Sequence, residues 1–319
     1  MTYHCKMNRR KFLRTLVALG TAYGASPLIR GTWAQAGERA RVRPGSLAEL
    51  EAVVATSQGK GPVANTNAVI DVLGGMARFV SRGNFVAVKP NIAWNRSPAQ
   101  GANTNPEVVA TVVRACLQAG ARQVVVFDRP CEDSRRTYRR SGIAEAAEAA
   151  GARVEHVRAG DFLETRIPKG KSLTSWPFHR YAFEADVFVN IAAAKDHNEA
   201  ILTMAMKNLM GIMGGERGDI HRDIHQKLAD ASTVIQPDLN IIDATRIMVA
   251  RGPQSTSPDD LRETDTVIAS VNQVTADAYG AQTLPFPRLP EDKVFGYIRA
   301  AGEMGLGQTS LEAMEVRSA

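Results

Sequence analysis

The sequence predicts an α/β protein with a mostly parallel sheet and helices on both faces, a Rossmann-like arrangement in three layers. Apolar runs of four to six residues, such as those within 85–88 and 124–127, alternate along the chain with segments of helical periodicity. These runs are continuously apolar, which is typical of parallel strands buried on both faces. Residues 37–319 suit one large domain, and we expect them to form a single α/β domain.

Local signals delimit the elements in chain order. Ser46 and Glu49 have the spacing of a capping box, which predicts a helix start. Asn105 as a cap, Pro106 in the first turn and Gly120 as a stop delimit another helix. The predicted helices are 46–57, 66–81, 105–120, 141–151, 199–213, 219–232, 273–283 and 291–302. The predicted strands are 85–91, 122–128, 153–157, 185–192, 239–243 and 265–272.

The first 36 residues (1–36) predict a twin-arginine (Tat) signal peptide. Arg9 and Arg10 precede an apolar stretch at 16–29, and Ala-Gln-Ala at 34–36 provides a small-x-small cleavage pattern. The apolar stretch is too short to span a bilayer well. We therefore expect a Tat-exported periplasmic protein, with the Tat translocase as its partner during export. An uncleaved membrane anchor and an amphipathic helix of a cytosolic protein are the alternative interpretations.

The net charge of the chain resides in that N-terminal segment. The whole sequence has a formal net charge of +6, and residues 1–36 contain six basic residues and no acidic one. The remainder is near neutral, so we expect no nucleic-acid partner. Cys116 and Cys131 form no CxxC pair and supply no zinc or iron–sulfur framework. An oxidising compartment permits a disulfide between them, but the place of Cys116 in a predicted helix favours a small buried thiol.

Polar side chains recur where the predicted strands end. In open α/β sheets, ligands bind in the crevice beyond the carboxyl ends of the strands. We therefore expect these side chains to converge on one ligand site. Each of them taken singly also fits a turn former or a helix cap. They are Lys89, Asn91, Asp128, Asn190 and Asp243, with Lys195 and His197 just beyond the strand at 185–192.

The segment 195–225 holds three of the six histidines in the chain. His221 and His225 are four residues apart, on one face of a predicted helix, so their imidazoles could share a metal ion. His197 is the candidate third ligand. The acidic and basic residues between the two helical histidines favour the alternative of a solvated helix face.

Lys207 lies in the apolar segment "ILTMAMKNLMG". A lysine among apolar neighbours needs an anionic partner or acts as a base with a shifted pKa. The adjacent Asn208, together with Thr203, is a candidate ligand-binding residue, whereas we expect the methionines of this segment to fill the core. The Gly-Gly pair at 214–215 could bring backbone N–H groups to a phosphate or carboxylate, but it matches neither the dinucleotide-binding motif nor the P-loop. No GxSxG nucleophile motif is present.

Eight segments together resemble the domain-of-unknown-function family 362. They are "VAVKPNIAW", "NTNPEVVATVVRACLQAGARQVVVFD", "IPKGK", "EADVFVNIAAAKDH", "LTMAMKNLMGIMG", "DIHRDIHQKLADAS", "PDLNIIDATRIMVARGP" and "ADAYGAQTL", and the resemblance runs from about Gly74 to Gly307. Members of that family are α/β proteins, sometimes fused to ferredoxin-like modules, and some carry Tat signals. The resemblance therefore implies a link to redox or metal biology.

The resemblance also singles out particular positions. The residues that match the recurrent polar motifs of the family are Lys89, Asn91, Asp128, Lys195, His197, Thr203, Lys207, Asn208, His221 and Asp243. The chain has no ferredoxin cysteine cluster, so an iron–sulfur centre would have to come from a partner protein. Where the family often has Asp-Pro, this chain has Asn272 and Gln273, which weakens a ligand role there.

These observations lead to the hypothesis of a metal- or redox-linked periplasmic enzyme that acts on a small anionic molecule. His197, Lys195 and Lys207 are the candidate catalytic residues. The candidate ligand-binding residues are Lys89, Asn91, Asp128, Asn190, Thr203, Asn208 and Asp243, and the candidate metal ligands are His221, His225 and His197. The candidate cofactors are a divalent metal or an iron–sulfur centre supplied by a redox partner protein, and membrane contact is expected only through an uncleaved signal. The alternatives are a non-catalytic carrier of a metal or cofactor, an assembly factor for an exported redox enzyme, and a ligand-binding protein resembling a transport receptor.

Overall fold

The computed structural model describes residues 38–319 except 288 and 292. Nine strands form one sheet in the order β11-β1-β10-β9-β7-β2-β3-β4, with β8 paired to β7, and β5 and β6 form a separate ribbon. Within the described chain, only β8 and β10 run against the other strands of the large sheet. The strands are β1 (Val53–Gln58), β2 (Phe85–Pro90), β3 (Gln123–Asp128), β4 (Arg153–His156), β5 (Phe162–Arg166), β6 (Ser175–His179), β7 (Val187–His197), β8 (Ile201–Thr203), β9 (Leu239–Met248), β10 (Leu261–Ser270) and β11 (Glu315–Ser318).

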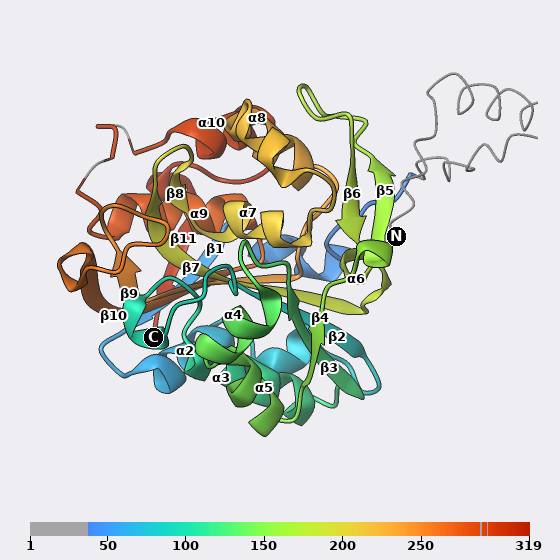
Figure 1. The fold of residues 1–319 in the computed structure, drawn as a ribbon, viewed down its shortest axis with the longest axis vertical. Helices are drawn as coiled ribbons and strands as arrows, with labels where there is room; N and C mark the ends of the chain where they lie inside the picture. The colour runs from blue at the N-terminus through green and yellow to red at the C-terminus, as the bar shows by residue number, and fades with distance from the viewer. Residues whose placement is uncertain (1–37, 288, 292) are drawn as a thin grey trace, which may run out of the picture. The chain divides into compact units, whose positions relative to one another are not determined.

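Helices cover both faces of this sheet (Figure 1). The helices are α2 (Pro62–Val72), α3 (Pro106–Gln118), α4 (Ser134–Arg140), α5 (Ile143–Ala149), α6 (Tyr181–Glu184), α7 (Ala205–Asn208), α8 (Ile224–Ser232), α9 (Gln273–Thr283) and α10 (Gly296–Glu303). Residues of α2, α3 and α5 share one core with the sheet, and residues of α7, α8, α9 and α10 share the other. The predicted class, a mostly parallel α/β sheet in three layers, is confirmed.

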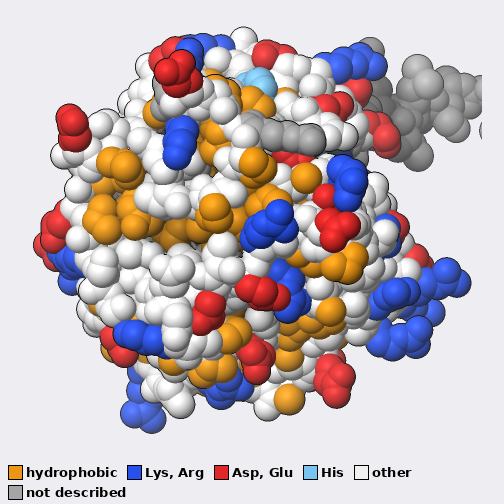
Figure 2. Space-filling model, turned by 90° about the vertical axis from the view of Figure 1, so that its left-hand side faces the viewer, with side chains coloured by type: hydrophobic (Ala, Val, Ile, Leu, Met, Phe, Trp, Pro, Cys, Tyr) orange, Lys and Arg blue, Asp and Glu red, His pale blue; other side chains and the backbone are white. Residues whose placement is uncertain are grey.

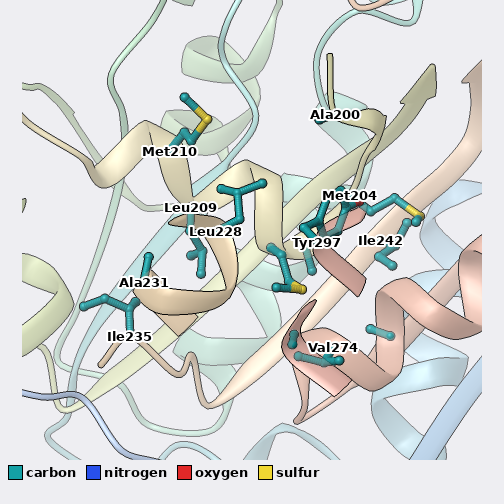
Figure 3. Packing of buried hydrophobic residues seen from close by; sticks show 14 of the residues in the cluster. Ala200, Met204, Leu209, Met210, Leu228, Ala231, Ile235, Ile242, Val274 and Tyr297 are labelled. Carbon is teal, nitrogen blue, oxygen red and sulfur yellow. The ribbon is translucent and has the colours of Figure 1, made fainter. Parts of the chain in front are cut away.

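The pleat of the central strands directs alternate side chains into the two cores. In β2, Val86 and Val88 join the core under α2, α3 and α5, whereas Ala87 joins the core on the other face. Both sets are fully buried, which explains the continuous apolar runs of the sequence. Figure 3 shows part of the second core, in which Met204 and Met210 pack among aliphatic side chains. The four methionines of residues 201–213 were predicted to fill the core, and all four are buried: Met204, Met206, Met210 and Met213.

The predicted helix at 46–57 is wrong in its second half. Residues Gly45–Leu50 form a 3-10 turn, and the chain then enters β1, which lies between β10 and β11. Val53 and Val54 are buried in that strand. Their β-branched side chains suit a pleated strand, so pairing with two distant strands outweighed the local capping pattern.

The predicted helix at 199–213 is also wrong over most of its length. β7 runs on to His197 and the chain turns back into β8, which places Thr203 opposite Lys195. The short helix α7 and a 3-10 turn, Leu209–Ile212, follow. Because the backbone of residues 201–203 pairs with β7, it cannot form the predicted helix. Lys207 and Asn208 end one short helix that lies directly beside β7.

The predicted helix at 219–232 is interrupted between its two histidines. A 3-10 segment, Arg217–His221, precedes α8, and Asp223 between them has a φ of 65°. A residue in this left-handed conformation interrupts a right-handed helix. His221 and His225 therefore do not share one helix face, and the prediction that they do is wrong.

Other features also differ from the prediction. The helix predicted at 66–81 begins at Pro62 and ends before Gly74 and Gly75, both of which have positive φ. The strand predicted at 265–272 begins at Leu261 and is antiparallel to β9. It is also not the last strand, because β11 pairs with β1.

The cysteines and the absence of a membrane-spanning helix in the described residues were also addressed by the sequence. Cys116 is a buried free thiol in α3, whose pKa burial raises to about 12, and Cys131 is an exposed free thiol. Over residues 38–319, as far as they are described, no helix combines the length and apolar character needed to cross a membrane.

Candidate functional site

A cavity of about 600 Å³ lies at the carboxyl ends of β2, β3 and β7. The chain segment from α7 to the 3-10 segment at 217–221 forms its opposite wall. Eight of the residues that the sequence singled out line it: Asn91, Asp128, Lys195, His197, Thr203, Lys207, Asn208 and His221. The lining also includes Trp94, Arg129, Cys131, Glu199, Gly211 and Arg217.

A buried ion pair joins Asp128 in the cavity wall to Lys89 behind it. Lys89 Nζ is 2.9 Å from Asp128 Oδ1 and donates a hydrogen bond of 2.9 Å to Asn208 Oδ1. Asp128 Oδ2 accepts a hydrogen bond of 2.7 Å from the backbone N–H of Ile92. Burial lowers the pKa of Lys89, and the charge of Asp128 opposes this effect. Gly211 packs so closely on the pair that a Cβ there would overlap Asp128 Oδ1 and Lys89 Cε.

A row of buried amides connects this pair to neighbouring strands. The strand register places Lys89, Asn190 and Asn240 side by side on β2, β7 and β9. Asn190 Nδ2 donates to Asn240 Oδ1 at 3.0 Å, and Asn208 Nδ2 donates to Asn190 Oδ1 at 2.8 Å. Asn91 Nδ2 donates to Asn208 Oδ1 at 3.0 Å. Because each amide both donates and accepts, the network fixes the orientation of Asn91 and Asn208 at the cavity.

Lys195 is fully buried at the cavity wall. Its Nζ donates hydrogen bonds of 2.6 Å to Asn91 Oδ1 and of 2.6 Å to the carbonyl oxygen of Ala102. Both acceptors are uncharged, and they match the two N–H groups of a neutral amine, which leaves its lone pair free. Burial, reinforced by the charge of Lys207, lowers the pKa of Lys195 to about 7. Lys195 is therefore suited to act as a base near neutral pH.

His197 is held as a neutral imidazole. Its Nδ1 accepts hydrogen bonds from the backbone N–H groups of Glu199 at 3.2 Å and Ala200 at 3.1 Å. Burial, followed by the charge of Lys207, lowers the pKa of His197 to about 3. The neutral ring then carries its proton on Nε2 and can donate a hydrogen bond to a ligand. The ring of His221 stacks against it with centroids 6.3 Å apart.

The charges that line the cavity are predominantly positive. The basic side chains are Lys207, Arg129, Arg217 and Lys195, whose amine is partly neutral near pH 7, and the two carboxylates are Asp128 and Glu199. Asp128 is paired with Lys89, and Glu199 Oε2 lies 3.4 Å from His221 Nε2. On the face shown in Figure 2, by contrast, basic and acidic side chains are interspersed over most of the surface.

The two arginines are fixed by backbone carbonyl groups. Arg217 donates hydrogen bonds of 2.7 Å to the carbonyl oxygens of Arg129 and Pro130. Arg129 donates to the carbonyl oxygens of Met213, at 2.8 Å, and Gly215, at 3.1 Å. In the described chain neither guanidinium has a carboxylate within ion-pair distance. Their positive charges therefore remain available to an anionic ligand.

Lys207 is anchored through its backbone and not through its side chain. The carboxylate of Asp277 on α9 accepts the N–H groups of Ala205, at 2.6 Å, and Met206, at 2.9 Å, at the start of α7. Burial raises the pKa of Asp277 to about 8. The Lys207 ammonium is half-buried and has no hydrogen-bond or ion-pair partner within the described chain. Burial lowers the pKa of Lys207 to about 8.

Several of the predicted site residues lie elsewhere. Lys89 and Asn190 belong to the buried network behind the cavity and do not line it. Asp243 lines a separate cavity of about 300 Å³, where its carboxylate accepts hydrogen bonds from the N–H of Asn105 and from Thr245. β7 separates β9 from β2 and β3, and Asp243 does not line the first cavity.

The predicted metal ligands are not brought together. His225 lies in a third cavity beside Phe295 and Gly296, away from His221 and His197. Among the residues that the structure describes, no group of three or more His, Cys, Asp or Glu side chains is arranged to hold a metal ion. The hypothesis of a shared site of His197, His221 and His225 is therefore corrected, because the break at Asp223 separates the two helical histidines.

Four residues of the cavity and its buried network were not among the predicted site residues: Arg129, Arg217, Cys131 and Asn240. Arg129 directly follows the strand-end residue Asp128, so the same strand-end rule could have found it. Asn240 is a polar residue inside the apolar run "LNIID", which is a detectable signal for a buried network. Arg217 has no comparable signal, because only the path of the chain after the Gly-Gly pair brings it to the cavity.

Together, the fold and the cavity define a class of protein: an α/β protein with a cavity lined mainly by basic side chains at the carboxyl edge of its sheet. The chain belongs to the family described as "Domain of unknown function (DUF362)", whose model matches residues 86–282. It is 26% identical over 223 residues to the thylakoid-associated protein sll1697 of Synechocystis sp., and the aligned part covers 67% of each chain.

Two solved structures show a distant likeness. The lactate racemase apoprotein of Thermoanaerobacterium thermosaccharolyticum is 11% identical with a TM-score of 0.43, over 75% of this chain and 58% of that one. A protein of Thermotoga maritima is 10% identical with a TM-score of 0.37, over 77% of this chain and 59% of that one. The chain thus spans less than two thirds of the length of either protein, and neither likeness bears on its function.

Proposed function

We propose that this protein is an enzyme that binds a small anionic molecule in the cavity and transfers a proton to or from it. The observation that carries the proposal is the excess of positive charge in the lining. Lys207, Arg129 and Arg217 have no carboxylate partner in the described chain, whereas both lining carboxylates have partners. Partly desolvated cations without partners favour an anionic ligand, because a ligand carboxylate or phosphate then supplies the missing charge.

The lining residues divide between binding and proton transfer. Arg129, Arg217 and Lys207 bind the anionic group of the ligand. Lys195 acts as the general base, since its lone pair is free and its pKa is lowered to about 7. His197 donates its Nε2–H to a ligand oxygen on which negative charge develops. Lys89 takes no direct part; from behind the wall it neutralises the lining carboxylate of Asp128.

Anion binding is tested by calorimetry with sulfate, phosphate and small carboxylates at constant ionic strength. The Lys207→Gln variant should bind these anions about tenfold more weakly, because a charge-assisted hydrogen bond is lost. The matched control is Lys60→Gln, which removes an exposed lysine outside the cavity. Equal affinities in the wild type and Lys207→Gln, or no saturable binding in the wild type, would contradict the proposal.

Proton transfer is tested separately by NMR in deuterated water. A bound carboxylate with a C–H next to its carboxyl or carbonyl carbon should exchange that hydrogen for deuterium in the presence of the wild type, and not with Lys195→Met. If anions bind saturably but none of them exchanges a hydrogen for deuterium, the result would favour a second candidate function. In that case the protein is a non-catalytic carrier of a small anionic ligand or cofactor.

We also propose that the protein acts in the periplasm after export through the Tat translocase. Support comes from the paired Arg9 and Arg10, the apolar stretch at 16–29 and the Ala-Gln-Ala pattern at 34–36. These residues lie outside the described part of the chain. A redox partner that carries an iron–sulfur centre is a further proposal, which rests on the family resemblance alone, and co-purification from the periplasm tests it.

A further inference from the structure

We propose that Lys207 is a nucleophile that forms a Schiff base with the carbonyl group of an anionic aldehyde or ketone bound in this cavity. This inference rests on the proposed anion-binding function and adds the chemical class of the substrate. In anion binding, Lys207 contributes only its positive charge, whereas here its amine also forms a covalent bond with the ligand.

The first support is the contrast among the three lysines of the region. Lys89 is held in an ion pair with Asp128, and Lys195 Nζ is held by Asn91 and the carbonyl oxygen of Ala102. Lys207 lines the same cavity, and its Nζ has no hydrogen-bond or ion-pair partner within the described chain. Since the Asp277 carboxylate fixes the start of α7, the backbone of Lys207 is fixed while its amine stays free to reach a ligand.

The second support is the electrostatic environment of the Lys207 amine. Burial is the largest influence on it, the charges of Arg217 and Lys89 act in the same direction, and Cys131 and Glu199 oppose them. The resulting pKa of about 8 leaves an appreciable fraction of unprotonated amine near neutral pH. A lysine that is desolvated and close to other cationic groups is the usual form of an amine nucleophile activated for attack on carbonyl carbon.

The chemistry balances with groups that already line the cavity. Lys195 takes a proton from the Lys207 ammonium, and the neutral amine adds to the carbonyl carbon, so that a C–N bond forms. His197 Nε2–H donates to the carbonyl oxygen during the addition. That oxygen takes one proton from the adduct nitrogen and a second from Lys195. The C–O bond then breaks, the oxygen leaves as water, and a protonated C=N bond remains. The net change is one ammonium and one carbonyl converted into one iminium and one water, so no oxidant or reductant is required.

The experiment is reductive trapping with sodium cyanoborohydride, which delivers hydride to an iminium carbon. The two probes are pyruvate, which carries a carboxylate, and glyceraldehyde 3-phosphate, which carries a phosphate. The expected result is a mass gain equal to one probe less one oxygen atom, with the modification mapped by peptide mass spectrometry to Lys207. Acetone, the uncharged analogue of pyruvate, should give about tenfold less adduct, because it lacks the anionic group that the arginines bind.

Two variants serve as controls. Lys207→Arg keeps the positive charge but cannot form a Schiff base, so it should lose the adduct while its melting temperature stays close to that of the wild type. Lys60→Arg, at an exposed position outside the cavity, should be trapped like the wild type.

The outcomes separate this inference from the proposed function. If neither probe gives an adduct although calorimetry shows that anions bind, the nucleophilic role of Lys207 is overturned and the anion-binding function stands. An adduct on Lys195 or on a surface lysine, or one retained in Lys207→Arg, also overturns the assignment. Failure of the wild type to bind any anion overturns both.

Discussion

At the scale of single residues, three lysines within one region have three different environments. Lys89 neutralises a buried carboxylate, Lys195 donates only to uncharged acceptors, and Lys207 has no partner within the described chain. Burial lowers the pKa of each of them. The partners of each amine are therefore the basis for the role proposed for it: a structural cation for Lys89, a base for Lys195 and a nucleophile for Lys207.

The lowered pKa of Lys195 makes stability depend on pH. The pKa falls from 10.5 to about 7 on folding, so at intermediate pH the unfolded chain binds a proton that the folded protein lacks. Raising the pH from 7 towards 10 therefore stabilises the folded state, by at most about 1.4 kcal/mol per pH unit from this residue. Lys195→Met should remove that contribution from the slope of the unfolding free energy against pH, measured by urea denaturation. An unchanged slope in Lys195→Met, or a slope equally reduced in the exposed-site control Lys60→Met, would refute the assignment.

The Lys89–Asp128 pair makes a separate prediction. Lys89→Met leaves the buried Asp128 carboxylate without its cation and should lower the free energy of unfolding by about 3–5 kcal/mol. The double variant Lys89→Met/Asp128→Asn should be less unstable than the sum of the two single changes, because it leaves no unpaired charge. Urea denaturation of all four proteins measures this coupling, and strictly additive effects would show that the pair is not coupled.

At the scale of elements, short segments after β7 position the site. β8, α7 and the two 3-10 segments at 209–212 and 217–221 carry Thr203, Lys207, Asn208 and Arg217 to the ends of the parallel strands. The close approach of this segment to the sheet depends on Gly211, which packs against the Lys89–Asp128 pair. A short, irregular segment is thus as important to the site as the long strands that it covers.

Gly211→Ala tests this close approach. The added methyl group would overlap Asp128 and Lys89, so we expect a loss of about 1–3 kcal/mol in stability together with weaker anion binding. Gly160→Ala is the matched control in a 3-10 segment outside the cavity, since an added Cβ there has no atom within 4 Å. Thermal unfolding and calorimetry measure both effects. Equal melting temperatures for the two variants would show that the segment can move away without cost.

At the scale of the whole molecule, the order of the strands decides which polar residues meet. β7, β2 and β3 are adjacent and parallel, so the side chains at their carboxyl ends lie around one cavity. β9 is also parallel, but it lies on the far side of β7 and pairs with the antiparallel β10, and its Asp243 lines a different cavity. Whether a strand-end residue lines this cavity therefore depends on the position of its strand in the sheet, and not only on its place at the end of a strand.

The export proposal also concerns the whole chain. Substituting Arg9→Lys and Arg10→Lys together should retain the protein in the cytoplasm, because the Tat route reads the arginine pair. Cell fractionation followed by immunoblotting measures the distribution, with the unaltered chain in a strain without a Tat translocase as the reference. Delivery of the doubly substituted protein to the periplasm would contradict export by this route.

Much of the architecture could be predicted from the sequence. The apolar runs of β2, β3 and β7, the cap of α3 at Asn105 and the strand-end residues Asn91 and Asp128 all follow from local rules of periodicity and capping. These rules succeed because a strand buried on both faces needs apolar side chains throughout, whatever its partners are. The α/β class and the family followed from the same segments.

Only the tertiary structure decided the composition of the cavity. The turn from β7 into β8, the left-handed Asp223 and the closeness of Gly211 to Asp128 arise from contacts between segments far apart in the chain. Those contacts bring Arg217 into the site and leave His225 outside it. Sequence periodicity indicates which face of an element is apolar. The position of a charged side chain beyond the end of a strand depends instead on the segments that pack over it. Only the folded molecule determines which segments those are.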